Sequence, residues 1–395
     1  MAATGVGHGT SGLPPRGAGP DPARSAHAGP VVSTMGVEEE FLLVDKRTRA
    51  PVGRADPVIR AASAVLGDQV QDEFYSCMAE VCTRPATTAG DLRAQLSSLR
   101  GVLADAAGEA GCRLVASGTA VVPPGDPIPV TDTARYRRMA RMFGALVDGS
   151  LGIVCGCHVH IGTADRAQAL LLANHLRPWL PTLQALAVNS PFAGGRDTGF
   201  ASRRCLEFGR WPTAGPAPVL DPDTYEDTAD ALVGSGTLMD RRMIYWFARP
   251  SEHVPTVEFR FADVSADLDT TVLIALLLRG LCATVLSEAG AGRPPASVPS
   301  ALLRAAHGYA ARYGATGPAL DPFTGTAAPA RALTADLVTA AEPGLRAAGD
   351  LGEVQALLDG LGRKGTGADR QRSAFRRTRS LEAVVDGLAE ATAGP

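Results

Sequence analysis

Three short stretches far apart in the chain place acidic or imidazole side chains at every second residue. They are residues 36–41, 155–162 and 257–263. Successive side chains of an extended strand point to opposite faces, so residues two apart share a face. Each strand thereby presents a pair of side chains: Glu38 with Glu40, His158 with His160, and Glu258 with Arg260. Because burying unpaired charge is costly, a sheet face built from them is either solvated or a metal and phosphate site.

The middle stretch also contains Cys155 and Cys157, which raises zinc as an alternative. The two-residue period places these thiols on one face of the strand and both histidines on the other. The thiols are therefore better explained as small core side chains than as zinc ligands. Gly156 and Gly162 flank the histidines and would let a ligand approach the backbone.

More acids lie in a second apolar segment, residues 78–83, which predicts a strand containing Glu80. Glu73 lies seven residues earlier and falls on the opposite face unless a bulge or bend intervenes. Glu39 would point away from its two acidic neighbours and have a structural role. The pooled carboxylates suit Mg²⁺ or Mn²⁺ holding a polyphosphate such as ATP better than they suit zinc. Arg260 would then stabilise the charge of a transferring phosphoryl group.

Explanations without function exist for each motif. Three consecutive acids usually form a solvated turn or edge, and the alternation at residues 257–261 also fits a half-exposed strand with a surface ion pair of small worth. Residues 41–44, however, are all apolar. A charged side chain without a partner or a role would be unfavourable in a strand that continues into such an apolar run.

Composition excludes some function classes. The chain has 395 residues, 45% hydrophobic and 20% charged, enough for one large domain or two ordinary ones. A net charge of −3 gives no basic surface for a nucleic-acid partner. The apolar run at residues 272–278 ends at Arg279 and is far shorter than the roughly 20 residues of a membrane span. It predicts a buried helix and no membrane partner.

Cysteine and lysine usage adds two expectations. Seven cysteines without a secretory signal predict free thiols and a reducing, cytoplasmic location. Lys46 and Lys364 are the only lysines, and no Gly-x-x-x-x-Gly-Lys motif occurs. Phosphate binding would therefore fall to arginine, metal ions and backbone amides.

The order of elements predicts the scaffold. Residues 1–30 hold seven Gly and five Pro and predict a disordered tail. Strands are expected at residues 31–44, 74–83, 113–117, 155–161 and 256–261, and helices from 88, at 135–147, from 164, at 268–287 and after 301. Because strands and helices do not alternate as in βαβ units, we expect an α+β fold whose largely antiparallel sheet has helices on one face only. Residues 190–224 predict a long functional loop.

Several motifs resemble a known family. They are residues 34–41 (TMGVEEEF), 118–119 (GT), 135–136 (RY), 156–162 (GCHVHIG), 189–192 (NSPF), 197–203 (DTGFASR), 249–251 (RPS), 256–260 (TVEFR) and 365–372 (GTGADRQR). Collinear from about residue 31 to residue 372, they resemble the glutamate–cysteine ligase type 2 family, also called the carboxylate–amine ligases.

The resemblance implies a glutamine-synthetase-like catalytic fold in a single domain over residues 31–395, a curved sheet with helices on its outer face. It implies a ligase that uses ATP and Mg²⁺, activates a carboxylate, expected to be glutamate, as an acyl phosphate, and joins it to an amine, with weak glutamate–cysteine ligase activity as one outcome. The implied metal-binding set is Glu38, Glu40, Glu73, Glu80, His158 and Glu258. Glu258 and Arg260 are the implied catalytic residues, and Arg260, Arg249 and Arg203 the implied cofactor-binding residues.

Three positions depart from the family pattern. Ala120 stands where relatives often have His, Phe247 where an acid is common, and Tyr309 where Trp is common. None is an implied metal ligand, so we expect these departures to line the acceptor side and to affect substrate identity. Two other functions stay open: a phosphotransferase, or an ATP-binding protein without catalysis. The amine acceptor and the choice between monomer and homo-oligomer also stay open.

Overall fold

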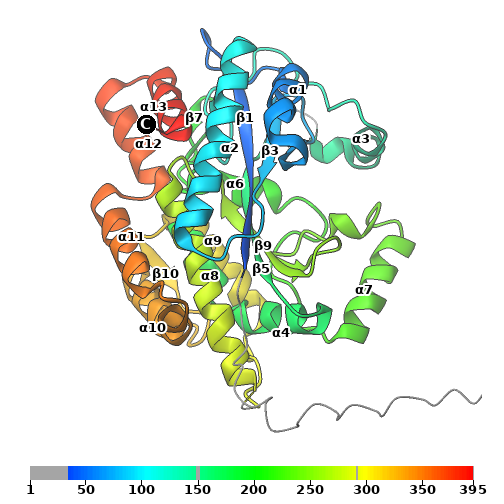
Figure 1. The fold of residues 1–395 in the computed structure, drawn as a ribbon, viewed down its shortest axis with the longest axis vertical. Coiled ribbons are helices and arrows are strands. Elements are labelled where there is room, and N and C mark those ends of the chain that lie inside the picture. Colours follow the sequence, from blue (N-terminus) through cyan, green and yellow to red (C-terminus); the bar gives the residue numbers. More distant parts are fainter. Residues whose placement is uncertain (1–33, 148–151, 291, 395) are drawn as a thin grey trace, which may run out of the picture.

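A seven-stranded antiparallel sheet forms the centre of the fold (Figure 1). The computed structural model describes residues 34–147, 152–290 and 292–394. The strands run in the order β2-β3-β1-β5-β9-β8, and β4 pairs with the second half of β1. Their bounds are β1 (Met35–Asp45), β2 (Val70–Asp72), β3 (Met78–Cys82), β4 (Cys112–Val115), β5 (Gly156–Gly162), β8 (Ala248–Pro250) and β9 (Thr256–Asp263).

Helices and two small hairpins surround this sheet. The helices are α1 (Ala55–Leu66), α2 (Ala89–Glu109), α3 (Ala134–Val147), α4 (Arg166–Leu176), α5 (Leu180–Leu186), α6 (Arg203–Phe208), α7 (Pro222–Gly234), α8 (Leu268–Ala289), α9 (Ser300–Tyr313), α10 (Ala330–Ala348), α11 (Leu351–Lys364), α12 (Gly367–Thr378) and α13 (Leu381–Ala393). The hairpins pair β6 (Phe192–Ala193) with β7 (Arg196–Asp197), and β10 (Pro318–Leu320) with β11 (Ala327–Pro329). Short 3₁₀ turns occupy Gly67–Gln69 and Arg241–Met243.

Alternate residues of the central strands face the helices and form a core. Val37 of β1, Val159 of β5 and Phe259 of β9 are buried in one cluster with the apolar side chains of α8. Because side chains alternate along a strand, the residues between them face the other side of the sheet. One face of these strands therefore packs against α8, as expected. The opposite face is the one expected to carry the site.

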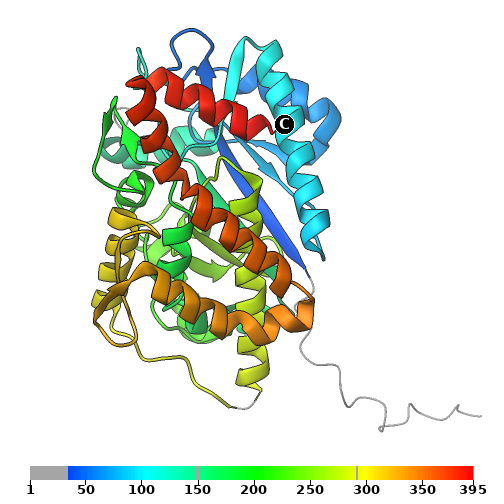
Figure 2. The ribbon, with the colours of Figure 1, turned by 90° about the vertical axis from the view of Figure 1, so that its left-hand side faces the viewer.

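The helix α8 is the centre of the packed layer. It packs against α10, α11, α2 and β5, and Figure 2 shows α10 to α13, in orange to red, as an outer layer in front of it. By length and composition α8 could cross a membrane, but 83% of its most apolar stretch is buried inside the fold. Its buried Arg279 is neutralised by Asp350, with Nε 3.0 Å from Oδ2. This is the pattern of a central core helix.

Some predicted bounds change. The strand predicted at residues 74–83 is shorter, Met78–Cys82, because residues 73–77 form the bend and turn that connect β2 to β3. The predicted loop at residues 190–224 is wrong as a structureless segment, since it contains the hairpin of β6 with β7, helix α6 and the start of α7. Strand β1 begins at Met35, and the predicted tail at residues 1–30 lies outside the described residues.

Candidate active site

Cross-strand pairing aligns the acidic and imidazole side chains on the face of the sheet away from α8. The directly opposed pairs are Glu38 with His158, Glu40 with Glu80, His160 with Glu258, and Glu258 with Arg249. Opposed residues on one face have their Cβ atoms about 5 Å apart. Five strands thus bring together residues that are far apart in the sequence.

Of these side chains, Glu38, Glu80, His160, Arg249 and Glu258 line a cavity of about 630 Å³, whereas Glu40 and His158 are not among its lining residues. Ten of its charged or phenolic lining residues are Glu38, Glu73, Glu80, Arg135, Tyr136, His160, Tyr245, Arg249, Glu258 and Arg260. The volume is within the range of small-molecule and cofactor sites. The wall therefore combines carboxylates with arginines, the combination expected for metal ions and phosphate.

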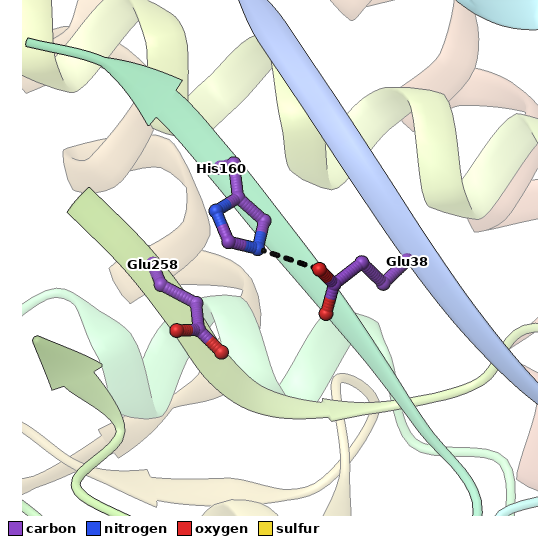
Figure 3. A group of neighbouring side chains, drawn as sticks. All are labelled: Glu38, His160 and Glu258. Atoms are coloured by element: carbon purple, nitrogen blue, oxygen red, sulfur yellow. Dashed lines mark ion pairs between the residues drawn. The ribbon is translucent and has the colours of Figure 1, made fainter. Parts of the chain in front are cut away.

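One candidate metal-binding group consists of Glu38, His160 and Glu258 (Figure 3). Each offers one ligand atom, and these atoms lie within 4.8 Å of one another. The Nε2 atom of His160 is 3.3 Å from Oε1 of Glu38, while its Nδ1 is 2.8 Å from Oγ1 of Thr256. The hydrogen bond to Thr256 fixes the ring so that Nε2 faces the carboxylates.

A second candidate group consists of Glu40, Glu73 and Glu80, whose ligand atoms lie within the same distance. Glu73 belongs to neither strand of the β2–β3 pair but to the bend between them, which turns its side chain toward Glu40 and Glu80. The hydroxyl group of Tyr136 is 3.3 Å from Oε2 of Glu73. The sequence left open whether a bend lies between Glu73 and Glu80, and this bend is what brings Glu73 to the site.

His158 lies between the two groups. Its Nδ1 is 3.1 Å from Oε2 of Glu38, and its Nε2 is 3.6 Å from Oε1 of Glu40. Burial and the charge of Arg260 lower the pKa of His158, which favours the neutral ring that a metal ligand needs.

The second group carries more negative charge than the fold compensates. Burial and the charge of Glu40 raise the pKa of Glu73 to about 8. Burial and the charges of Glu38 and Glu73 raise the pKa of Glu80 well above its ordinary value. Such raised values are typical of carboxyl groups that share a site without a neutralising cation.

The first group is compensated by the protein. Burial opposes ionisation of Glu258, but the charges of Arg249 and Arg260 outweigh it and lower its pKa to about 2. Burial also opposes ionisation of Glu38, but the adjacent imidazoles of His158 and His160 outweigh it, so its pKa lies well below the ordinary value. Both carboxylates are therefore ionised at neutral pH.

The residues fit a divalent cation by a further criterion. The Nε2 atoms of His158 and His160 are buried and have no hydrogen-bond partner among the described residues. Buried polar atoms are nearly always satisfied, so such orphans need an explanation. Neutral imidazole nitrogens and carboxylate oxygens are both metal ligands, and a cation would satisfy the former and neutralise the latter. Burial opposes protonation of His160, but Glu38 and Glu258 outweigh burial and raise its pKa, so a cation would also displace that proton.

The three residues implied to bind a cofactor do not all lie at the site. Arg260 and Arg249 line the cavity and both form ion pairs with Glu258. Arg203 lies at the start of α6 and is held by Glu207 one helical turn later, with Nε 2.7 Å from Oε1. It is not among the residues that line the cavity.

The three departures do not lie on the cavity wall either. Ala120 and Phe247 are buried in the two hydrophobic clusters, and Phe247 packs against the ring of His307. Tyr309 lies on α9 and packs against Tyr313. None of the three positions is among the lining residues of this cavity, and their expected place on the acceptor side stays a prediction.

Three side chains away from the site have the structural roles expected. Glu39 is buried on the packed side, where its Oε2 accepts a hydrogen bond of 2.8 Å from Nε of Arg100. Cys155 and Cys157 are buried free thiols, and burial raises the pKa of both. Neither belongs to a candidate metal-binding group.

Sequence reasoning gave no role to several residues of the site. Its metal-binding set included His158 but omitted His160, although the two-residue period placed both on one face. Tyr136 occurs in a motif of the resemblance and contacts Glu73. Tyr245 has no such signal, and its ring lies beneath the guanidinium of Arg260, 5.5 Å from the ring centroid.

Comparison with known proteins gives a consistent result. Residues 34–387 match the family described as glutamate–cysteine ligase family 2 (GCS2). A relative from Saccharopolyspora erythraea, provisionally named glutamate–cysteine ligase 2-1, is 44% identical over 355 residues, which are 89% of this chain and 93% of that protein. A relative from Salinispora arenicola, provisionally named glutamate–cysteine ligase 2, is 42% identical over 93% of this chain and 98% of that protein.

Solved structures share the fold at low identity. The glutamate–cysteine ligase of Francisella tularensis, in complex with AMP, has a TM-score of 0.70 and 12% identity, over 93% of this chain and 89% of that one. A bifunctional glutathione synthetase from Pasteurella multocida has a TM-score of 0.67 and 14% identity, over 91% of this chain and 52% of that one. The expected glutamine-synthetase-like ligase fold is thus confirmed. The chain belongs to glutamate–cysteine ligase family 2, and with it to the ligases that join a carboxyl group to an amine.

Proposed function

We propose that this protein activates a carboxylate, with glutamate as the expected one, as an acyl phosphate at the expense of ATP and then joins it to an amine. The observation that carries the proposal is the convergence of two acidic groups and Arg260: every member except Glu40 lines the large cavity, and Glu40 lines the adjoining small one with Glu73 and Arg260. Acids alone would indicate cation binding, and arginines alone would indicate anion binding. Together they fit a nucleotide triphosphate with its divalent ions.

The two acidic groups would hold divalent cations, with Mg²⁺ expected and Mn²⁺ as an alternative. Glu38, His160 and Glu258 would hold one, and Glu40, Glu73 and Glu80 the other. His158 faces both groups and would support either. Bound cations would neutralise the carboxylates and the phosphate oxygens of the nucleotide.

The reaction has two bond exchanges. A substrate carboxylate oxygen attacks the terminal phosphorus of ATP, and the bond from that phosphorus to the ADP oxygen breaks. The amine nitrogen then attacks the acyl carbon, loses a proton, and inorganic phosphate leaves. Arg260 would offset the charge that accumulates on the phosphoryl oxygens in both exchanges.

The ion pairs of Glu258 make it a positioning group as well as a metal ligand. Its carboxylate contacts the guanidinium groups of both Arg249 and Arg260, which line the same cavity. A planar guanidinium held from one side leaves its other donors free for an anion. Glu258 would thus aim both arginines at the phosphate chain.

The identities of the carboxylate and the amine rest on membership of the family. The names of the relatives point to glutamate as the carboxylate and cysteine as the amine. A single catalytic domain, a cytoplasmic location and homo-oligomerisation stay predictions. Free cysteines throughout the chain support the reducing location.

The test incubates the protein with ATP, Mg²⁺, glutamate and a panel of amines that includes cysteine. ADP is followed by a coupled assay, and products are identified by mass spectrometry. We expect ADP together with an amide for at least one amine. A stable phosphorylated product without an amide would identify a phosphotransferase, and nucleotide binding without ADP release would identify a protein without catalysis.

A further inference from the structure

The row of site residues along β5 is interrupted by a glycine. Residues 156, 158 and 160 share one face of the strand because they are two apart. His158 and His160 bear the imidazoles, whereas Gly156 contributes only backbone, and its amide donates a 2.5 Å hydrogen bond to Oε2 of Glu40. The space that a side chain would fill at Gly156 lies beside the second acidic group.

That space is occupied by the guanidinium group of Arg204, which reaches the sheet from α6. A Cβ atom placed on Gly156 would lie 2.2 Å from one terminal nitrogen of Arg204 and 2.8 Å from its Cζ. A positive charge therefore lies flat against the sheet, in line with the two histidines. Gly156 is required here because the guanidinium takes the place of its side chain.

Arg204 is buried, at 2% exposed, yet it forms no direct ion pair among the described residues. Its charge nevertheless favours the ionised form of the buried Asp263 and so opposes the rise that burial causes in the Asp263 pKa. Within the described part of the chain the Nε of Arg204 has no hydrogen-bond partner, and a terminal nitrogen makes a long contact of 3.4 Å with the backbone oxygen of Arg260. Its remaining close partner is the ring of Phe208, whose centroid is 5.0 Å from Cζ.

Three of the four other buried arginines among the described residues are neutralised. Arg100 is paired with Glu39, Arg249 with Glu258, and Arg279 with Asp350. A buried, unpaired charge is costly, so a fold that retains one needs a reason. Arg177 also lacks an ion pair but lies at the end of α4, whereas Arg204 faces a cavity at the site.

The cavity beside Arg204 is small. Its volume is about 70 Å³, and among the groups that line it are Glu40, Glu73, Arg204 and Arg260. It shares Glu73 and Arg260 with the wall of the large cavity. This chamber can take a compact group such as a phosphoryl or carboxylate group, and two guanidinium groups face it.

Arg204 is held in place by the strand that carries Arg260. Asp263 at the end of β9 accepts hydrogen bonds of 2.7 Å from Ser190 and 2.8 Å from Ser202. Ser202 caps α6, and Ser190 accepts a 3.1 Å hydrogen bond from the backbone amide of Arg204. The position of this arginine is therefore determined by a buried hydrogen-bond network and does not depend on a surface loop.

We propose that Arg204 is a second anion-binding arginine of the reaction and that it holds, together with Arg260, the oxyanion of the reacting group in the small chamber. This inference rests on the proposed function, in which the oxyanion is either the terminal phosphate of ATP or the substrate carboxylate. Both are compact anions that match the forked donors of guanidinium. The substrate would thus supply the direct anionic contact that Arg204 lacks.

The test compares Arg204→Met with the wild type by isothermal titration of ADP and of a non-hydrolysable ATP analogue, each with Mg²⁺. If Arg204 binds the terminal phosphate, the affinity of the variant for the ATP analogue should fall roughly ten- to a hundredfold, the loss expected for hydrogen bonds to a charged group. Its affinity for ADP should be retained. If the carboxylate is bound, both nucleotides are retained and the KM for glutamate rises by a similar factor. Loss of ADP and analogue affinity to the same extent, or no change in any of the three, would overturn the proposal.

Two further variants separate a ligand role from a structural one. Gly156→Ala should displace the guanidinium while keeping the arginine, and it should reproduce the losses of Arg204→Met. Arg210→Met removes an arginine that pairs with Glu207 just beyond α6, and it should change none of these values. Circular dichroism checks that all three variants are folded.

An arm without nucleotide keeps the proposal distinct from the proposed function. Inorganic phosphate should raise the thermal unfolding temperature of the wild type and should not raise that of Arg204→Met. If the wild type binds no nucleotide but shows this phosphate response, the proposed function fails and the role of Arg204 as an anion-binding residue stands. If phosphate stabilises both proteins equally, the role of Arg204 is refuted.

Discussion

The raised pKa of Glu73 predicts that Glu73→Gln stabilises the metal-free protein and weakens metal binding. The pKa of Glu73 in the fold is about 8, against an ordinary value of 4.5, because burial and Glu40 favour the proton. The folded state therefore retains this proton while the unfolded chain releases it. The stability of the metal-free protein should fall as the pH rises from 4.5 toward 8.

The magnitude follows from that difference. Each pH unit over which the folded state holds the extra proton contributes about 1.4 kcal/mol, so the cost between pH 4.5 and pH 7 is about 3 kcal/mol. Glu73 is only partly buried, and solvent screening makes this an upper bound. Glutamine keeps the size of the side chain and removes the proton equilibrium, so Glu73→Gln should recover most of this cost.

The assay is urea unfolding of wild type and Glu73→Gln at pH 5 and pH 8, in EDTA and in Mg²⁺. In EDTA the variant should be the more stable protein at pH 8 and nearly equal at pH 5. In Mg²⁺ the wild type should gain stability and the variant should gain less, because one carboxylate ligand is missing. A variant that is less stable than the wild type in EDTA at pH 8 would refute the reasoning about the acidic group.

Three other predictions concern single positions. Glu258→Gln should abolish ADP release in the ligase assay while circular dichroism shows a folded protein, and undiminished activity would remove this carboxylate from the site. Glu39→Gln should lower the free energy of unfolding by about 3–5 kcal/mol, because it leaves the buried Arg100 unpaired; a change below about 1 kcal/mol would contradict that pairing. Cys157→Ala should retain Mg²⁺-dependent ADP release within about twofold, since buried structural thiols are inert. Loss of activity in a folded variant would instead indicate that this thiol is a metal ligand.

Much of the site could be read from strand periodicity. Alternation alone placed Glu38 with Glu40, and His158 with His160, because the period of two is a property of each extended strand. The same alternation put Glu39 and the two cysteines on the opposite face, where the structure has them buried. Local patterns of this kind need no knowledge of which strands are neighbours.

Periodicity could not predict the position of a side chain that depends on a bend in the backbone or on a contact between distant segments. Glu73 joins Glu40 because of a bend between β2 and β3, and Arg204 reaches Gly156 from a short helix far along the chain. Arg203 precedes Arg204 in the same motif and pairs with Glu207 instead. Neighbouring arginines on a helix point in different directions, so the motif could not indicate which of the two faces the sheet.

By itself, then, the sequence determined which side chains share a face of each strand and which faces are apolar, because both follow from backbone geometry within one segment. The tertiary structure alone decided the register between strands, which sets Glu38 against His158 and His160 against Glu258. Register depends on the packing of whole strands against α8 and its neighbours, a sum over many distant residues. The chemistry of this site arises from that sum.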